Sequence, residues 1–256
     1  MRQRSPSFAD HFSQARLFFH SMSPTEQEHI ISAYSFELGK VERAYIRERE
    51  VNEILANIDL KLAARVATNL GLPAPKKGTV DVPVSGFKQS PALSQMNLLG
   101  EGIRGRKVAL LVTDGVDGES VDALVKALEA ESAQIKLLGP TSAPVNTAQG
   151  KPLAVDAAME GLPSVVFDAV WVPAGKASVQ ALMTSGVALH FLLEAYKHLK
   201  PMGLASEAQP LLDKLGLKAD SGLLLGNDAK TYKAFIKAIG KHRVWEREAA
   251  AQAIPA

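Results

Sequence analysis

Two turns in this sequence carry side chains that could do chemistry at the end of a buried strand. The first follows the apolar residues 108–112, where Thr113-Asp114-Gly115 breaks the strand and an amphipathic helix begins. The second is the junction Gly203-Leu204-Ala205-Ser206-Glu207. A nucleophile elbow places Ser or Cys at such a strand-to-helix turn, with backbone N–H groups ready as an oxyanion hole. Ser206 is the nucleophilic candidate at that elbow.

The first turn is rich in glycine and acid, which raises the question of phosphate binding. Its sequence TDGVDGES is neither G-x-G-x-x-G nor a P-loop. Asp114, Asp117 and Glu119 would repel a phosphate. We interpret the turn as a tight connection whose acids stabilise the start of the next helix, which Ser120 is expected to cap.

Ser206 has a plain alternative to the catalytic hypothesis, because a serine at the start of a helix is a common N-cap. No histidine is close to it in sequence, and His190 and His198 lie one helix upstream. We favour the N-cap. The six histidines show no H-E-x-x-H motif or paired i, i+4 arrangement, so no metal site is predicted.

Composition narrows the functional classes further. The 256 residues are 46% hydrophobic, carry a net charge of +2 and include no cysteine. The missing cysteines exclude a disulfide framework, a cysteine nucleophile and a thiolate metal site, and they fit a cytoplasmic protein. The near-neutral charge and the lack of a long apolar run argue against nucleic-acid and membrane partners. A basic cluster at 233–243 is interpreted as a solvated face, and His242-Arg243-Val244-Trp245 as a docking corner.

The elements that would position these residues fall into three parts. Residues 1–72 read as helices, with start signals at Ser23 and Asp59 and a stop at Gly71. Residues 73–105 contain scattered prolines and glycines without a sustained period, which predicts an extended linker or wrapping arm. Three short helices bury little of their own apolar surface, so the first part is expected to pack on something else.

Residues 106–256 alternate between strands and helices. We predict strands at 108–112, 134–138, 169–173, 201–205 and 222–225, a hairpin at 146–153, and helices at 121–131, 177–184, 187–199, 207–215 and 228–242, the last capped by Asn227. Such alternation with short connections indicates a parallel sheet covered on both faces. The predicted fold is α/β, a flavodoxin-like three-layer sandwich.

Many short motifs, in the same order, resemble the C-terminal region of large-subunit heme catalases. They include RSPSF at 4–8, QARLF at 14–18, YSFEL at 34–38, YIRER at 45–49, IDL at 58–60, RVATNLG at 65–71, PALS at 91–94, EAYKHLKP at 194–201, HRVW at 242–245 and IPA at 254–256. The resemblance covers essentially the whole chain. It implies helices that pack on a heme-bearing β-barrel, an extended stretch, and a flavodoxin-like domain related to class I glutamine amidotransferases.

The same resemblance implies that the heme-binding and peroxide-cleaving residues lie upstream, in the barrel. The chain is therefore expected to be the C-terminal third of such a catalase, with no heme or other cofactor of its own. The related amidotransferase superfamily uses an elbow cysteine and an acid after the first strand. Asp117 falls near the acid position, but the elbow offers Leu204, Ala205 or Ser206. That chemistry is expected to be absent.

Three functional hypotheses follow. The first is a non-enzymatic accessory region that stabilises a catalase homotetramer and shapes access to its heme, the parent reaction being disproportionation of hydrogen peroxide. The second is a chaperone-like module that binds unfolded clients through apolar surface normally covered by the barrel. The third is a residual enzyme that acts through Ser206 or Asp117 on a small carbonyl or ester.

Overall fold

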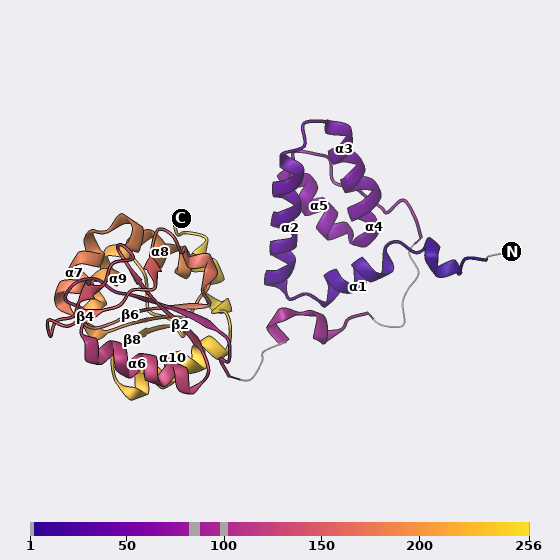
Figure 1. The fold of residues 1–256 in the computed structure, drawn as a ribbon. Coiled ribbons are helices and arrows are strands. Elements are labelled where there is room, and N and C mark those ends of the chain that lie inside the picture. The colour runs from indigo at the N-terminus through magenta and orange to yellow at the C-terminus, as the bar shows by residue number, and fades with distance from the viewer. Residues whose placement is uncertain (1–2, 82–87, 98–101, 256) are drawn as a thin grey trace. The chain divides into compact units, whose positions relative to one another are not determined.

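The computed structural model describes residues 3–81, 88–97 and 102–255, and they form two compact units. The first unit runs to residue 98 and the second from residue 99 (Figure 1). The boundaries predicted at 72 and 105 differ from this division, because residues 73–81 and 88–97 of the predicted arm belong to the first unit and residues 102–105 to the second. Among the described residues, no helix combines the length and apolar character that a membrane crossing requires.

The first unit is helical, as expected. It contains α1 (Ser13–Ser21), α2 (Pro24–Gly39), α3 (Ala44–Arg49), a π-helical stretch (Glu50–Leu55), α4 (Ala56–Ile58) and α5 (Leu60–Asn69). Ser23 and Glu26 form a capping box at the start of α2, and the Asp59 carboxylate accepts from the Leu62 amide at the start of α5. Both predicted start signals are confirmed.

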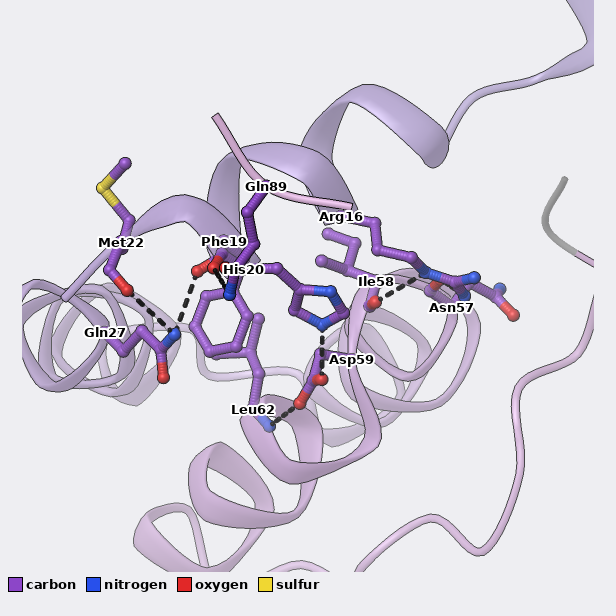
Figure 2. A network of polar contacts seen from close by, with 10 residues as sticks. All are labelled: Arg16, Phe19, His20, Met22, Gln27, Asn57, Ile58, Asp59, Leu62 and Gln89. Carbon is purple, nitrogen blue, oxygen red and sulfur yellow. Dashed lines mark hydrogen bonds and ion pairs between the residues drawn. The ribbon is translucent and has the colours of Figure 1, made fainter. Parts of the chain in front are cut away.

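Polar contacts fasten α1 to the junction between α4 and α5 (Figure 2). The Arg16 guanidinium donates to the carbonyls of Asn57 and Ile58 at 2.8 and 3.1 Å. One turn later, His20 Nε2 lies 2.9 Å from Asp59 Oδ2. Arg16 therefore satisfies carbonyls that the end of α4 leaves without helical partners.

The arm is held against this unit mainly by hydrogen bonds. The buried Asn57 Oδ1 accepts from the amides of Thr79 and Val80, and the Gln89 side chain donates to the His20 carbonyl. Further along, Glu26 accepts from the Ser94 hydroxyl. Two short 3₁₀ turns, Pro91–Leu93 and Gln95–Asn97, break the expected extended course. Residues 82–87 and 98–101 of the predicted arm lie outside the described residues.

The second unit is built on a six-stranded sheet of order β5-β2-β1-β6-β7-β8, with every neighbouring pair parallel. Its strands are β1 (Lys107–Leu111), β2 (Gln134–Gly139), β5 (Ala157–Ala158), β6 (Ala169–Val172), β7 (Met202–Leu204) and β8 (Leu223–Leu225). The antiparallel pair β3 (Val145–Asn146) and β4 (Pro152–Leu153) is the predicted hairpin.

Helices cover both faces of this sheet, which confirms the flavodoxin-like sandwich (Figure 1). On one face lie α6 (Gly118–Ala130) and α10 (Ala229–Gly240), and on the other α7 (Lys176–Thr184), α8 (Gly186–Lys197) and α9 (Gln209–Leu215). A last short helix, α11 (Glu248–Ala251), contacts α8. Trp171 fills the centre of the first face, in edge contact with Tyr232 and Phe235, and a Cβ on Gly203 would lie 1.9 Å from its ring.

Two predicted helix caps are wrong. Asp117, rather than Ser120, precedes α6 and accepts from the Glu119 amide. Asp228, rather than Asn227, precedes α10 and accepts from the Thr231 amide. In both helices the first turn begins one to three residues away from where the apolar periodicity alone placed it, since caps are set by backbone geometry and not by the apolar face.

Candidate functional site

The place to look for a site is the point where the chain reverses its direction of travel across the sheet. From β1 the chain moves outward to β2, whereas β6, β7 and β8 follow on the other side of β1. Ligands of open α/β sheets bind outside the carboxyl ends of the strands at such a switch point. Here it lies between Thr113–Asp117, after β1, and Pro173–Gly175, after β6. Residues 205–207 follow the adjacent β7.

In this protein the two loops at the switch point touch each other directly. The Asp117 amide donates to the Ala174 carbonyl at 2.8 Å, and the Ala174 amide donates to the Ser120 hydroxyl at 3.3 Å. Gly175 has a φ of 128°, and a Cβ there would lie 2.4 Å from the Gly115 carbonyl oxygen. Main-chain atoms therefore occupy the space between these loops.

Buried polar contacts continue this closure toward α7. The Thr113 hydroxyl lies 3.0 Å from the Ser178 hydroxyl, and the Thr113 amide donates to the same oxygen at 3.3 Å. Both residues are buried. Since buried polar groups are stable only when paired, this network favours the closed arrangement.

Two carboxylates of the first turn, Asp114 and Asp117, accept hydrogen bonds from nearby groups. Asp117 Oδ1 accepts from the Glu119 amide at 3.2 Å and from Gln149 Nε2 at 2.8 Å. Asp114 Oδ1 accepts from the Asn146 amide at 2.7 Å and so ties the turn to β3. Both carboxylates therefore hold neighbouring parts of the backbone in place around the turn.

Ser206 is exposed and is the first residue of a 3₁₀ turn, Ser206–Ala208, that leads into α9. The residue at the cap position is Ala205, which has no side-chain oxygen, so the expectation that Ser206 caps this helix is wrong. The neighbouring Glu207 has a defined role instead. Its Oε2 accepts from the Gly175 amide at 2.8 Å, at the N-terminus of α7. A carboxylate therefore occupies the Gly175 N–H, which is not free to bind an oxyanion.

His190 and His198, the two histidines upstream of Ser206 in the α/β unit, lie away from it. His190 lies beside Ser164, whose carbonyl accepts from Lys200 immediately before β7, so this histidine is at the amino end of that strand. His198 pairs with Glu194 at 3.2 Å in the same region. Ser206 follows the carboxyl end of β7. Ser206 and these histidines therefore lie at opposite ends of the strands.

Sequence reasoning missed a buried charged cluster at the amino ends of the strands. Arg247, 2% exposed, donates from Nε and Nη2 to both carboxylate oxygens of Asp220 at 2.6 and 2.8 Å, and its guanidinium lies over the Tyr196 ring. It also donates to the Lys200 carbonyl. The signal in the sequence was the predicted docking corner at 242–245, but the buried anchor is Arg247 and not Arg243.

Lys200 itself is buried, with 3% of its surface exposed. Burial is the main cause that lowers the pKa of its ammonium to about 8; the charge of Arg243 lowers it further, while Asp168 and Glu194 oppose the shift. The Lys200 ammonium donates to the Ser164 carbonyl and so joins β7 to the turn before β6. We interpret this cluster as a structural lock. No group of three or more potential metal ligands occurs among the described residues.

An α/β sandwich with a closed switch point, preceded by a separate helical unit, is the class of protein that these observations define. Residues 5–70 match the model of the catalase-related immune-responsive family. Residues 104–249 match the C-terminal domain found in long catalases. The chain therefore belongs to the long catalases and carries their C-terminal domain.

Individual relatives agree with that assignment. The chain is 68% identical to catalase HPII of Pseudomonas putida and 54% identical to catalase HPII of Pseudomonas aeruginosa, over 100% of its own length and 36% of theirs. It is 41% identical to catalase-B of Dictyostelium discoideum, over 99% of its length and 37% of that protein's. The chain thus spans little more than a third of the length of these relatives.

Proposed function

We propose that this chain is a non-catalytic accessory region of a long catalase that decomposes hydrogen peroxide. In this proposal the helical unit docks on the heme-bearing barrel, and the whole region stabilises the homotetramer and shapes access to the heme. The observation that carries it is the apolar surface that the helical unit leaves uncovered.

Exposed large apolar side chains are concentrated on the first unit. Of the twelve among the described residues, eight belong to it: Phe8, Phe18, Phe36, Tyr45, Ile54, Leu60, Val80 and Leu93. The side chains of Phe8 and Phe36 are 70% and 65% exposed. Their concentration on one unit supports an interaction surface there, since exposed apolar patches commonly mark such surfaces. A large neighbouring domain of the same polypeptide is the partner that family membership suggests.

The closed switch point supports the non-catalytic part of the proposal. Within the described α/β unit Ser206 has no hydrogen-bonded base, Asp117 is tied to Gln149, and Glu207 occupies the Gly175 amide. These observations argue against the residual enzyme. Among the described residues, no hydrogen bond joins Ser206 and Asp117.

Heme, which family membership suggests for the whole protein, does not fit three of the four tyrosines of this chain, Tyr45, Tyr196 and Tyr232. A catalase-type heme needs a tyrosinate with open space on one side. Tyr196 is 3% exposed with the Arg247 guanidinium over its ring, and Tyr232 is 6% exposed with Trp171 against its edge. Tyr45 is 57% exposed, so more than half of its surface is in water. We therefore derive no heme chemistry from these residues.

The docking proposal is tested by one substitution measured in two contexts. Phe36→Ser should cost about 2 kcal/mol of stability in a long catalase that carries this region, because the ring is buried there against the barrel. In the isolated chain the same change should cost less than about 0.5 kcal/mol, because the ring is already in water. Thermal unfolding and sedimentation of both proteins give the two values.

Leu225→Ser provides the matched control, since Leu225 is 40% exposed on the other unit. It should have the same small effect in both contexts. Equal effects of Phe36→Ser in both contexts would contradict docking through this surface.

The client-binding alternative draws on the same exposed side chains. It predicts that the isolated chain suppresses aggregation of a heated enzyme and that Phe36→Ser weakens this effect. If the chain has no effect at molar excess, the alternative is excluded.

A further inference from the structure

The two helices on one face of the α/β unit carry opposite charges. Exposed residues of α6 and its end include four carboxylates, Glu119, Asp122, Glu129 and Glu131, and one lysine, Lys126. The exposed residues of α10 and its end include four lysines, Lys230, Lys233, Lys237 and Lys241, and α10 itself contains no acid. One helix is therefore strongly acidic and its neighbour strongly basic.

These charges do not neutralise each other within the chain. The helices are neighbours, side by side on the same face of the sheet (Figure 1). Even so, none of the nine side chains forms an ion pair or hydrogen bond among the described residues. This holds also for Asp122 and Lys126, which are four residues apart on α6. Opposite charges on adjacent helices thus remain available to a partner.

A groove runs between the two helices and provides room for close contact. Its volume is about 1160 Å³, and its walls include Ala123, Ala127, Ala130, Ala229 and Ala234. Four lysines stand along it, Lys126, Lys230, Lys233 and Lys237, against the single acid Glu131. Alanines allow another helix to approach closely, and the lysines favour an acidic one. An acidic helix with exposed alanines is present in this protein, because α6 itself has that character.

We infer that this face, made of α6 and α10, binds the same face of a second copy of the chain. Both helices begin beyond the carboxyl ends of their strands, β1 and β8, so they run in the same direction. A twofold axis parallel to the helices, lying between the two copies, places α6 of each copy over α10 of the other. Acidic and basic rows then face each other twice, as an isologous interface requires.

This contact is independent of the proposed docking on a barrel, which uses side chains of the first unit. The two also respond differently to salt. Association through charge rows weakens as ionic strength rises, whereas association through exposed phenylalanines does not.

The test is a charge swap in the full chain, followed by sedimentation velocity at about 50 mM and about 500 mM salt. Asp122 and Lys233 each lie one turn inside their helices, at matching levels under the parallel axis. We expect a dimer at low salt, with a Kd raised at least about tenfold by Lys233→Glu, by Asp122→Lys and by high salt. The double variant should return the Kd to within about threefold of the original, because each new lysine faces a new glutamate.

Lys214→Glu is the matched control, since Lys214 is exposed on α9 at the opposite face. It changes the net charge equally and should leave the dimer unchanged. A chain that is monomeric at about 100 μM in low salt would overturn the inference. So would a dimer that Lys233→Glu does not weaken, or a double variant as weak as the single ones.

Discussion

At the scale of single residues, Gly175 decides what the switch point can hold. Its φ of 128° favours glycine, and a Cβ at this position would lie only 2.4 Å from the Gly115 carbonyl oxygen. The sequence placed a glycine after the third strand but gave no sign that its partner would be another loop. Ser206 and Asp117 could be picked out as candidates from residue type and position. The role of Glu207 at the Gly175 amide could not, because it depends on how β6 and β7 align.

Gly175→Ala tests this closure directly. The new methyl group must displace the Gly115 turn and adopt an unfavourable φ, so we expect a loss of about 3 kcal/mol in the free energy of unfolding. Denaturation in urea measures it. Gly186→Ala is the control, since a Cβ there meets nothing within 4 Å, and it should change stability by less than about 1 kcal/mol. A tolerated Gly175→Ala would mean that the two loops do not depend on each other.

Lys200 shows how burial of one amine makes stability depend on pH. The pKa of Lys200 is lowered from 10.5 to about 8 in the folded chain, chiefly by burial. Between these values the unfolded chain binds the proton and the folded chain does not, so stability rises with pH. Below pH 8 both states are protonated and this contribution is constant at its least favourable value.

We therefore predict that the free energy of unfolding rises more steeply with pH in the native chain than in Lys200→Met. From pH 8 to about 10.5, the native chain should gain up to about 3 kcal/mol relative to the variant, since other titrating groups cancel in the comparison. Urea denaturation at a series of pH values checks it. Parallel stability curves for the two proteins in this window would show that the Lys200 amine titrates normally.

At the scale of elements, sequence patterns predicted the type of each element more accurately than its first residue. Every predicted strand of the α/β unit is present, because buried parallel strands are short apolar runs between turns. The starts of α6 and α10 were misplaced, since Ser120 and Asn227 are as good cap residues as Asp117 and Asp228. The short β5 was missed because two alanines carry no strand signal. The hydrogen bonds by which Asn57 and Glu26 hold the described parts of the arm were not predicted, because they join residues 22 to 68 positions apart.

Asn57→Ala should release the arm. It removes the acceptor for the Thr79 and Val80 amides, so residues near the exposed Lys76 and Lys77 become more accessible to trypsin. We expect cleavage there at least about fivefold faster than in the native chain, as followed by mass spectrometry. Asn52→Ala is the matched control, because the Asn52 side chain donates to the Glu48 carbonyl, four residues earlier in the same continuous helical segment. Unchanged cleavage by Asn57→Ala would contradict this role.

At the scale of the whole molecule, the chain joins two units that differ in how complete they are. Helices of the α/β unit cover both faces of its sheet, and a lysine and an arginine are buried near the amino ends of the strands. Four aromatic side chains of the helical unit, Phe8, Phe18, Phe36 and Tyr45, are exposed. Sequence resemblance anticipated the family, but the closed switch point needed the structure, because it arises from residues about sixty positions apart.

The central claim is that this chain supports a catalase without doing chemistry itself. Its most direct test titrates the purified chain with hemin and then measures oxygen release from hydrogen peroxide. We predict no Soret band of a tyrosinate-bound heme and oxygen release no faster than free hemin gives. A stoichiometric Soret band accompanied by catalase turnover would contradict the account.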